Sequence, residues 1–300
     1  MKRFVQHLLI LTRFELADAI RSRRAAVTLL LYLAAALLST NAFVTAIQKL
    51  EVQLSDLLQL GTATPGAMAD ALWKSAKFRQ MISALIGDRD VAQSLMSMPP
   101  IALLYGFLAF FYTPFFVLLT ATPRVAGDVW TGAARFVLFR TSRAAWVLGK
   151  LLGQAALVLL AIGLGALGAW CLARIRLEGM DGMAAARGMA IMGFKAWIFS
   201  LPFLGLALGI SQLVRSPNTA NALGFIAWLG TGILAVTAKR FAGDGLRAGW
   251  DLALMLVPQG YQLDLWRLDL TSMATATVYL LALGAAYTAI GFAVFSRRDM

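Results

Sequence analysis

The chain has 300 residues, of which 60% are apolar and only 14% are charged. Soluble globular proteins carry roughly 45–50% apolar and about 25% charged residues, so this composition excludes an ordinary soluble domain and predicts several membrane-spanning segments. The formal net charge of +12 leaves two interpretations open, a surface that binds nucleic acid or basic flanks of membrane spans.

Residues 1–24 precede the first long apolar segment and predict an amphipathic helix. Phe4, Leu8, Leu11 and Phe14 recur at three- and four-residue spacing, and the charged residues fall away from them. The apolar run is too short for the core of a signal peptide. We therefore expect a helix that lies at the membrane surface, the alternative being a frayed, solvated N-terminus.

Six segments reach the length of about 20 mostly apolar residues that a spanning helix needs. They are residues 25–47, 99–122, 144–172, 188–214, 219–238 and 272–295. Only residues 215–218 separate the fourth segment from the fifth, which predicts a tight helical hairpin. The expected fold class is an all-α membrane protein with a single transmembrane domain over residues 1–300.

The basic residues indicate which side of the membrane the termini face. With six spans both termini lie on one side, which carries 14 basic and 4 acidic residues, against 12 and 11 on the other side. The basic residues on the termini side are denser and closer to the span ends, which predicts that both termini are cytoplasmic. Because they are scattered flanks and not one stripe among aromatic residues, they argue against a nucleic-acid partner.

The two longest loops, residues 48–98 and 239–271, lie on the opposite side. The spacing of apolar residues in the first loop predicts a helix over residues 65–86 with Gly87 as its C-cap. We expect a helical pair packed on the outer face of the membrane. In the second loop, the apolar run at residues 250–257 is too short to span, so it is interfacial or re-entrant. The acidic residues after it are typical of a solvated surface and not of a metal site.

The loop between the second and third spans, residues 123–143, carries the strongest pattern. Val125, Val129 and Phe136 share one face of a predicted helix. The polar residues of the same helix are Arg124, Asp128 and Arg135. A helix of this kind either coats the bilayer or offers an apolar ridge to the groove of a soluble partner.

Four elements of this stretch resemble the signature of type-2 ATP-binding-cassette (ABC) transporter permeases. They are Asp128, Gly132, the pair Ser142-Arg143, and the pair Gly149-Lys150 at the start of a span. Residues 14–24 and 295–299 resemble the surface helix and the C-terminus of the same family. The chain departs from the family pattern at Asp128, where Glu is usual.

The resemblance implies a half-transporter in a bacterial inner membrane. Two permeases, identical or paralogous, would dimerise within the lipid, and each would dock a separate cytoplasmic ATPase on its coupling segment to drive export. The residues implied to couple are Arg124, Val125, Asp128, Val129, Gly132, Arg135, Phe136, Ser142, Arg143 and Lys150. Leu151 follows Gly149-Lys150 where a P-loop requires Ser or Thr. We therefore expect ATP and Mg²⁺ on the partner and no cofactor on this chain, which is not itself an enzyme.

Three residues inside the spans are candidates for a substrate path. Tyr105 and Tyr112 belong to the aromatic second span, where packing is the commoner role, and Lys195 is the one charge well inside a span. An intramembrane cation is a candidate site by default, but the long stem of Lys195 would also reach the outer interface, roughly 10 Å away. Gly205 and Gly209 in the fourth span predict close packing against another helix.

Other classes of protein remain as alternatives. A secondary transporter usually buries several carboxylates or paired charges, whereas Lys195 is the one buried charge predicted here. An intramembrane enzyme has no support: the single His7 lies outside the spans and excludes an HExxH site, and the single Cys171 excludes a disulfide. A membrane anchor that holds an ATPase without transport would share every feature described above.

Overall fold

The computed structural model describes residues 2–21, 23–58, 80, 83–84, 86–177, 180–241 and 247–298. Every regular element within these residues is helical. The helices are α1 (Lys2–Arg21), α2 (Arg23–Leu58), α5 (Arg89–Leu95), α6 (Pro100–Trp130), α7 (Ala133–Leu138), α8 (Arg143–Arg176), α9 (Gly182–Leu213), α10 (Pro217–Phe241), α11 (Arg247–Met255), the 3₁₀ turn Pro258–Tyr261, α12 (Gln262–Trp266) and α13 (Leu270–Ser296).

Six of the described helices are long and apolar enough to cross a membrane, namely α2, α6, α8, α9, α10 and α13. The expectation of an all-α protein with six spans is therefore confirmed. In the most apolar stretch of α6 and α9, 67% and 72% of the residues are buried inside the protein, against 22% in α2 and 17% in α10. The helices α6 and α9 thus form the core, and α2 and α10 lie at the periphery.

Glycines allow α9 and α13 to pack with their backbones in contact. A Cβ atom on Gly205 would lie 2.2 Å from the carbonyl oxygen of Gly284, and one on Gly291 would lie 2.5 Å from that of Gly209. Such distances exclude any side chain, so this crossing depends on glycine. The predicted packing role of Gly205 and Gly209 is confirmed.

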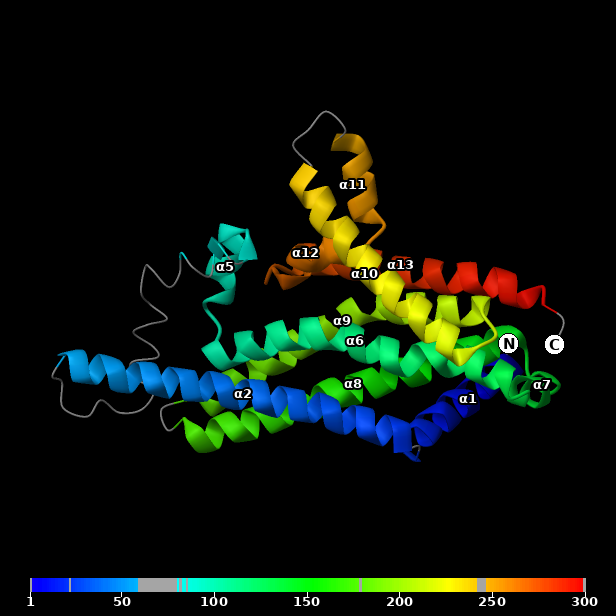
Figure 1. Ribbon diagram of the computed structural model, residues 1–300, viewed down its shortest axis with the longest axis horizontal. Coiled ribbons are helices and arrows are strands. Elements are labelled where there is room, and N and C mark those ends of the chain that lie inside the picture. The colour runs from blue at the N-terminus through cyan, green and yellow to red at the C-terminus, as the bar shows by residue number, and fades with distance from the viewer. Residues whose placement is uncertain are drawn as a thin grey trace.

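The outer segments differ in extent from the sequence-based expectations. Helix α2 continues to Leu58, so the beginning of the predicted loop 48–98 is helical. The predicted helix over residues 65–86 lies almost entirely outside the described residues, but Gly87 has a φ of +78° and its N–H binds the Ser83 carbonyl at 2.9 Å. Helix α11 contains most of the short apolar run and lies against the outer part of α10 (Figure 1).

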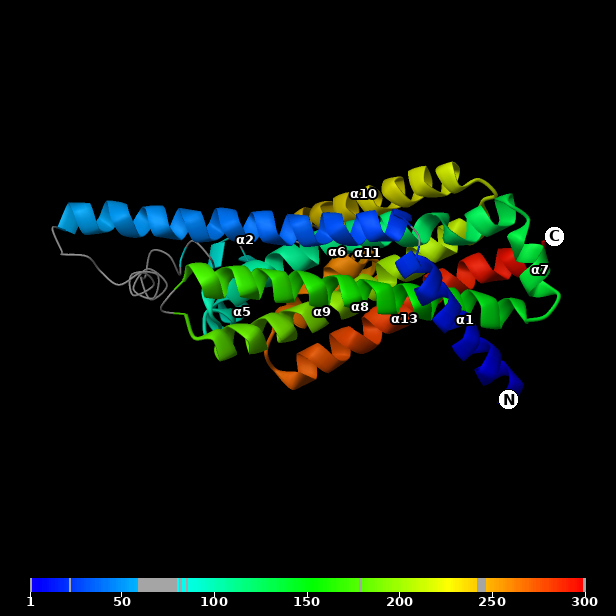
Figure 2. The ribbon, with the colours of Figure 1, turned by 90° about the horizontal axis from the view of Figure 1, so that it is seen from below.

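The two chain ends lie at the same end of the bundle. Figure 1 shows α1, α7 and the last turn of α13 together there, with α5 and the end of α2 at the opposite end. The view in Figure 2 shows α1 crossing beside α8 and α7 projecting beyond the spans. This arrangement is the one expected for an even number of spans. We call the end that carries α7 the α7 end.

Candidate functional site

The segment between the second and third spans is divided by a sharp turn. Helix α6 continues past the predicted span to Trp130, and Gly132 then adopts a φ of +76°, a left-handed conformation that favours glycine. The prediction of one continuous helix through this segment is therefore wrong, because α6 ends before Gly132 and α7 begins a new helix after it. As a result Val125 is buried in α6, whereas Phe136 of the short helix α7 is 77% exposed.

A buried cluster of charges lies next to this turn, formed by Glu15, Asp128 and Lys150. The side chain of Lys150 is only 3% exposed, and its ammonium forms ion pairs with Glu15 Oε1 and, at 2.7 Å, with Asp128 Oδ2. The ammonium also lies 5.0 Å from the centre of the Trp146 ring. Burying a lysine is costly unless carboxylates pair with it. This ion cluster therefore joins α1, α6 and α8.

Helix α1 reaches the cluster because glycines let it approach α8 closely. A Cβ atom on Gly149 would lie 2.7 Å from the Cβ of Leu11, and one on Gly153 would lie 2.6 Å from the Cβ of Glu15. The face of α1 that packs on α8 therefore includes a carboxylate, while Phe14 of the predicted apolar face is 64% exposed.

A second ion pair fixes α1 to α6, and a serine fixes α6 to α9. Arg124 Nη1 lies 3.1 Å from Asp18 Oδ2, at a partly exposed position. On the buried side of the same turn, Ser211 Oγ accepts hydrogen bonds from the N–H groups of Val125 and Ala126 at 3.1 and 3.0 Å. The end of α6 is thus held from two sides.

The start of α8 is fixed to the end of α13. Ser142 Oγ caps α8 by accepting a hydrogen bond from the Ala145 N–H at 3.2 Å. Arg143 donates to the carbonyl oxygens of Phe295 and Ser296 at 3.0 and 2.5 Å, a favourable place for a cation because it is the C-terminal end of a helix. Helix α7 itself is largely exposed. The two helices that flank it are held in place, α6 by contacts with α1 and α9 and α8 by contacts with α13.

The structure brings some of the predicted coupling residues together and separates others. Ion pairs link Arg124 to Asp18 of α1, and Lys150 to Glu15 of α1 and to Asp128. Phe136 of α7 is exposed and takes no part in these contacts. Sequence reasoning missed the acceptors Glu15, Asp18 and Ser211. A signal existed for Glu15, because a lysine in an apolar segment needs a carboxylate or backbone carbonyls as partners, and few acidic residues belong to the same end of the spans as Lys150.

The three candidates for a substrate path make different contacts. Tyr105 is buried and donates to the Ile162 carbonyl at 2.5 Å, and Tyr112 is half-buried beside the ring of Phe111. Lys195 is 1% exposed, and its ammonium donates to the carbonyl oxygens of Arg267 and Trp266 at 2.7 and 3.4 Å. The stem of Lys195 reaches the chain at the end of α12, which covers the ammonium, so that backbone carbonyls and not water solvate it. Its place on a substrate path stays a prediction.

Aspartates organise the loops at the outer end. Asp269 caps α13, and hydrogen bonds from Ser272 lower the pKa of its carboxyl below the usual 3.8. Asp88 caps α5, and the Val91 N–H in particular lowers the pKa of its carboxyl below the same value. Arg267 lies 3.4 Å from Asp88, which ties α5 to the segment after α12. Within the described residues, no three His, Cys, Asp or Glu side chains are placed to hold a metal ion.

Comparison with known protein families gives one result that covers nearly the whole chain. The family model that matches is described as ABC-2 family transporter protein, and the match extends over residues 9–300. A search of curated proteins gives no match. The matched range includes α6, α7 and α8 together with Glu15, so it contains the whole ion cluster.

Proposed function

The chain belongs to the ABC-2 family of transporter proteins, and we propose that it is the permease subunit of an ABC exporter, driven by a separate cytoplasmic ATPase. The observation that carries this proposal is the exposure of α7 between two helices that cross the membrane. Helix α6, with 31 residues, ends just before α7, and helix α8, with 34 residues, begins just after it. A displacement of α7 would therefore move two spans directly.

The surface of α7 has the chemistry of a docking helix. Phe136 and the adjoining Phe139 are 77% and 87% exposed, although they lie at the end of the bundle and not along its long sides. Aromatic anchors of this kind supply most of the binding energy when a short helix enters a groove on a soluble partner. We infer that the partner is the ATPase subunit and that the α7 end faces the cytoplasm of an inner membrane.

The ion cluster and the contacts of α1 support a mechanical role for this end. ATP binding shifts a partner ATPase between two states, and a docked helix follows that change only if its surroundings move as a unit. Lys150, Glu15 and Asp128 join the membrane-surface helix to both spans that flank α7. No step of ATP hydrolysis is assigned to this chain. Its part is to bind, to transmit motion and to open a path.

A second permease is part of the proposal. The peripheral helices α2 and α10 expose apolar residues along most of their length, which either lipid or a second permease would cover. Whether that second permease is an identical copy or a paralogue changes nothing in the role of α7.

Co-purification tests the proposal. The tagged full-length chain is extracted from its native membrane in mild detergent, and the retained proteins are assayed for ATP hydrolysis and identified by mass. We expect an ATPase subunit with the unaltered chain and its loss with the double variant Phe136→Asp/Phe139→Asp. Ile175→Asp is the matched control, because Ile175 is 79% exposed at the opposite end of α8. Failure of the unaltered chain to retain any ATPase would contradict the proposal.

A further inference from the structure

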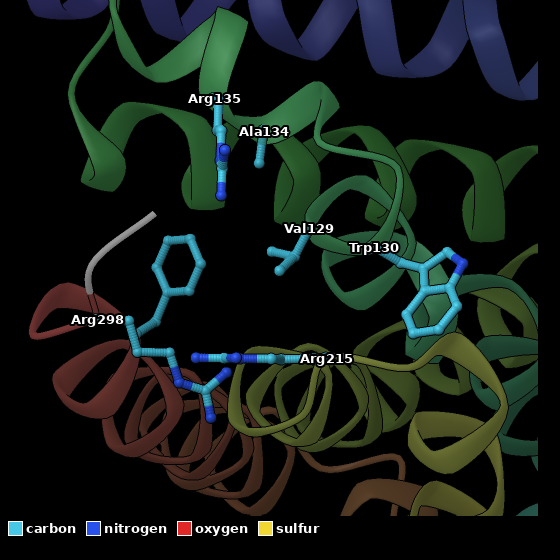
Figure 3. A pocket seen from close by; sticks show the side chains of 7 residues that line it. Val129, Trp130, Ala134, Arg135, Arg215 and Arg298 are labelled. Atoms are coloured by element: carbon cyan, nitrogen blue, oxygen red, sulfur yellow. The ribbon is translucent and has the colours of Figure 1, made fainter.

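A cavity of about 260 Å³ lies at the α7 end, enclosed by elements that are far apart in the sequence. Its walls come from the end of α6, from α7, from the α9–α10 connection and from the end of α13. The lining residues are Val129, Trp130, Ala134, Arg135, Arg215, Phe295 and Arg298. Figure 3 shows Arg135 entering from one side and Arg215 and Arg298 from the opposite side.

The three arginines differ from Lys150 and Arg124, at the same end, in what they contact. Lys150 and Arg124 are paired with carboxylates. Among the residues that the structure describes, no carboxylate lines the cavity, and neither Arg135 nor Arg215 forms an ion pair. Arg298 donates to the carbonyl oxygen of Leu213, which holds its side chain in place. Like charges that converge in this way favour an anion between them.

The position of the cavity identifies the kind of anion. Arg215 follows the last residue of α9 by two positions, Arg298 follows the last residue of α13 by two positions, and Trp130 is the last residue of α6. The ends of spans lie at the level of the lipid headgroups, where tryptophan is also enriched. The anionic groups that a membrane concentrates at this depth are the headgroup phosphates of its acidic lipids.

We propose that this cavity binds the phosphate of an acidic phospholipid from the leaflet at the α7 end. Guanidinium groups match phosphate oxygens in pairs. The cavity is smaller than the roughly 300–1,000 Å³ of sites for drug-sized ligands, and so fits a headgroup. Val129 and Trp130 supply an apolar wall for the glycerol and upper acyl carbons. The bound lipid joins α7 to α13 and to the α9–α10 connection, so it steadies the surroundings of α7.

Lipid titration tests this proposal without any transport or ATPase assay, so its result is separate from that of the proposed function. The full-length chain in neutral detergent is titrated with phosphatidylglycerol, with phosphatidylcholine and with inorganic phosphate. Binding is followed by native mass spectrometry and by the Tm from tryptophan fluorescence. We expect phosphatidylglycerol to bind and to raise the Tm, and the other two to have little effect.

Variants of the exposed arginines localise the binding. Each basic residue near a membrane surface strengthens the attraction to acidic lipid about fivefold, so Arg135→Gln/Arg215→Gln should weaken binding roughly 25-fold. Arg297→Gln is the control, because Arg297 adjoins Arg298 in the chain but does not line the cavity. Arg215→Gln, in an exposed connection, tests the site if the double variant folds poorly, with an expected loss of about fivefold.

Three outcomes would overturn the proposal. Equal binding of phosphatidylcholine and phosphatidylglycerol would show that the charge of the headgroup is not recognised. If Arg297→Gln weakened lipid binding as much as Arg215→Gln, the arginines would act through the overall positive charge of the surface and not through the cavity. Stabilisation by inorganic phosphate in place of the lipid would assign the cavity to a free anion.

Discussion

Two lysines of this protein are almost completely buried, and they are held in different ways. Lys150, near the α7 end, is 2% exposed and pairs with the carboxylates of Glu15 and Asp128. Lys195, midway along α9, is 1% exposed and binds two backbone carbonyl oxygens at the end of α12. Within the described residues, no carboxylate lies within ion-pair distance of Lys195.

The contacts of Lys150 and the contacts of Lys195 have different roles in the fold. Lys150 neutralises charges that arrive on two other helices, so its loss would leave a carboxylate stranded inside the protein. Lys195 meets only partial charges, since the carbonyls at a helix end carry the negative pole of its dipole. The first contact therefore joins three helices, α1, α6 and α8. The second attaches a short outer helix to the core.

Replacing Lys150 should have the largest effect. Lys150→Met leaves Glu15 buried and unpaired, and breaking a buried ion pair from one side costs about 3–5 kcal/mol. We expect the free energy of unfolding in mixed micelles, followed by tryptophan fluorescence, to fall by that amount. If the chain is the proposed exporter subunit, the coupling of ATP hydrolysis to transport should fall with it, because the ion pair that ties α1 to α8 is lost.

A double variant separates charge from packing. Glu15→Met/Lys150→Met removes both deeply buried charges, while Asp128 is 38% exposed and keeps its hydration. Replacing a buried pair by apolar side chains is often close to neutral, so most of the stability should return. A double variant that is less stable than Lys150→Met would show that packing, and not an unpaired charge, causes the loss.

Replacing Lys195 should have a smaller effect. Lys195→Met removes one short hydrogen bond from a charged donor, at 2.7 Å, and one long, weak one, at 3.4 Å, but it strands no carboxylate. A single hydrogen bond of the first kind contributes about 1.5–3 kcal/mol. We expect a loss of about 2 kcal/mol in the same unfolding assay. A loss of stability equal to that of Lys150→Met would show that stranding a carboxylate is not what makes Lys150 the more important of the two lysines.

Within the ion cluster, Asp128 should matter less for stability than Glu15. Its side chain is 38% exposed against 8% for Glu15, and Glu15 still neutralises Lys150 when Asp128 is changed. Asp128→Asn should therefore cost about 1 kcal/mol, as expected for partly exposed pairs. A cost as large as that of Lys150→Met would make Asp128 the main counter-ion.

The sequence predicts the fold well where the signal is local. Six spans follow from hydropathy, because a helix in lipid must be apolar along its own length. Gly205 and Gly209 indicate a close helix crossing for a similar reason. Their lack of a side chain can be read from the sequence without knowing which helix packs against them. The resemblance of residues 123–150 to a family signature likewise depends on neighbouring residues.

The candidate site was harder to predict because its contacts are distant in the chain. Glu15 and Lys150 are 135 positions apart, and their pairing requires α1 to pack on α8. The break at Gly132 interrupts an apolar periodicity that continues across it, so periodicity predicts one helix where there are two. The partners of Lys195 are backbone carbonyls, which every residue carries and which therefore leave no mark in the sequence.

The smallest expected effect concerns the charge that acts on Lys195 from a distance. Asp269, at the start of α13, is the acidic residue whose charge favours the Lys195 ammonium. Its carboxyl has a pKa below the usual 3.8, chiefly because of hydrogen bonds from Ser272, so it stabilises the folded state above that pH. This contribution is lost as the pH falls through the lowered pKa. Asp269→Asn, which keeps the capping oxygen, should therefore lower the Tm slightly near neutral pH and have no effect in strong acid.

The pH dependence of that difference in Tm tests whether the charge of Asp269 stabilises the folded state. Asp88 also has a lowered pKa, but it is present in both proteins, so its titration cancels when their Tm values are compared at each pH. A difference that vanishes in acid shows that the Asp269 charge stabilises the folded state, through the Ser272 hydrogen bonds and the nearby Arg267 and Lys195 cations together. A difference that is the same at every pH would contradict this, because Asp269 would then act only as a cap. Lys195 would in that case depend on backbone dipoles, and its contrast with Lys150 would be greater.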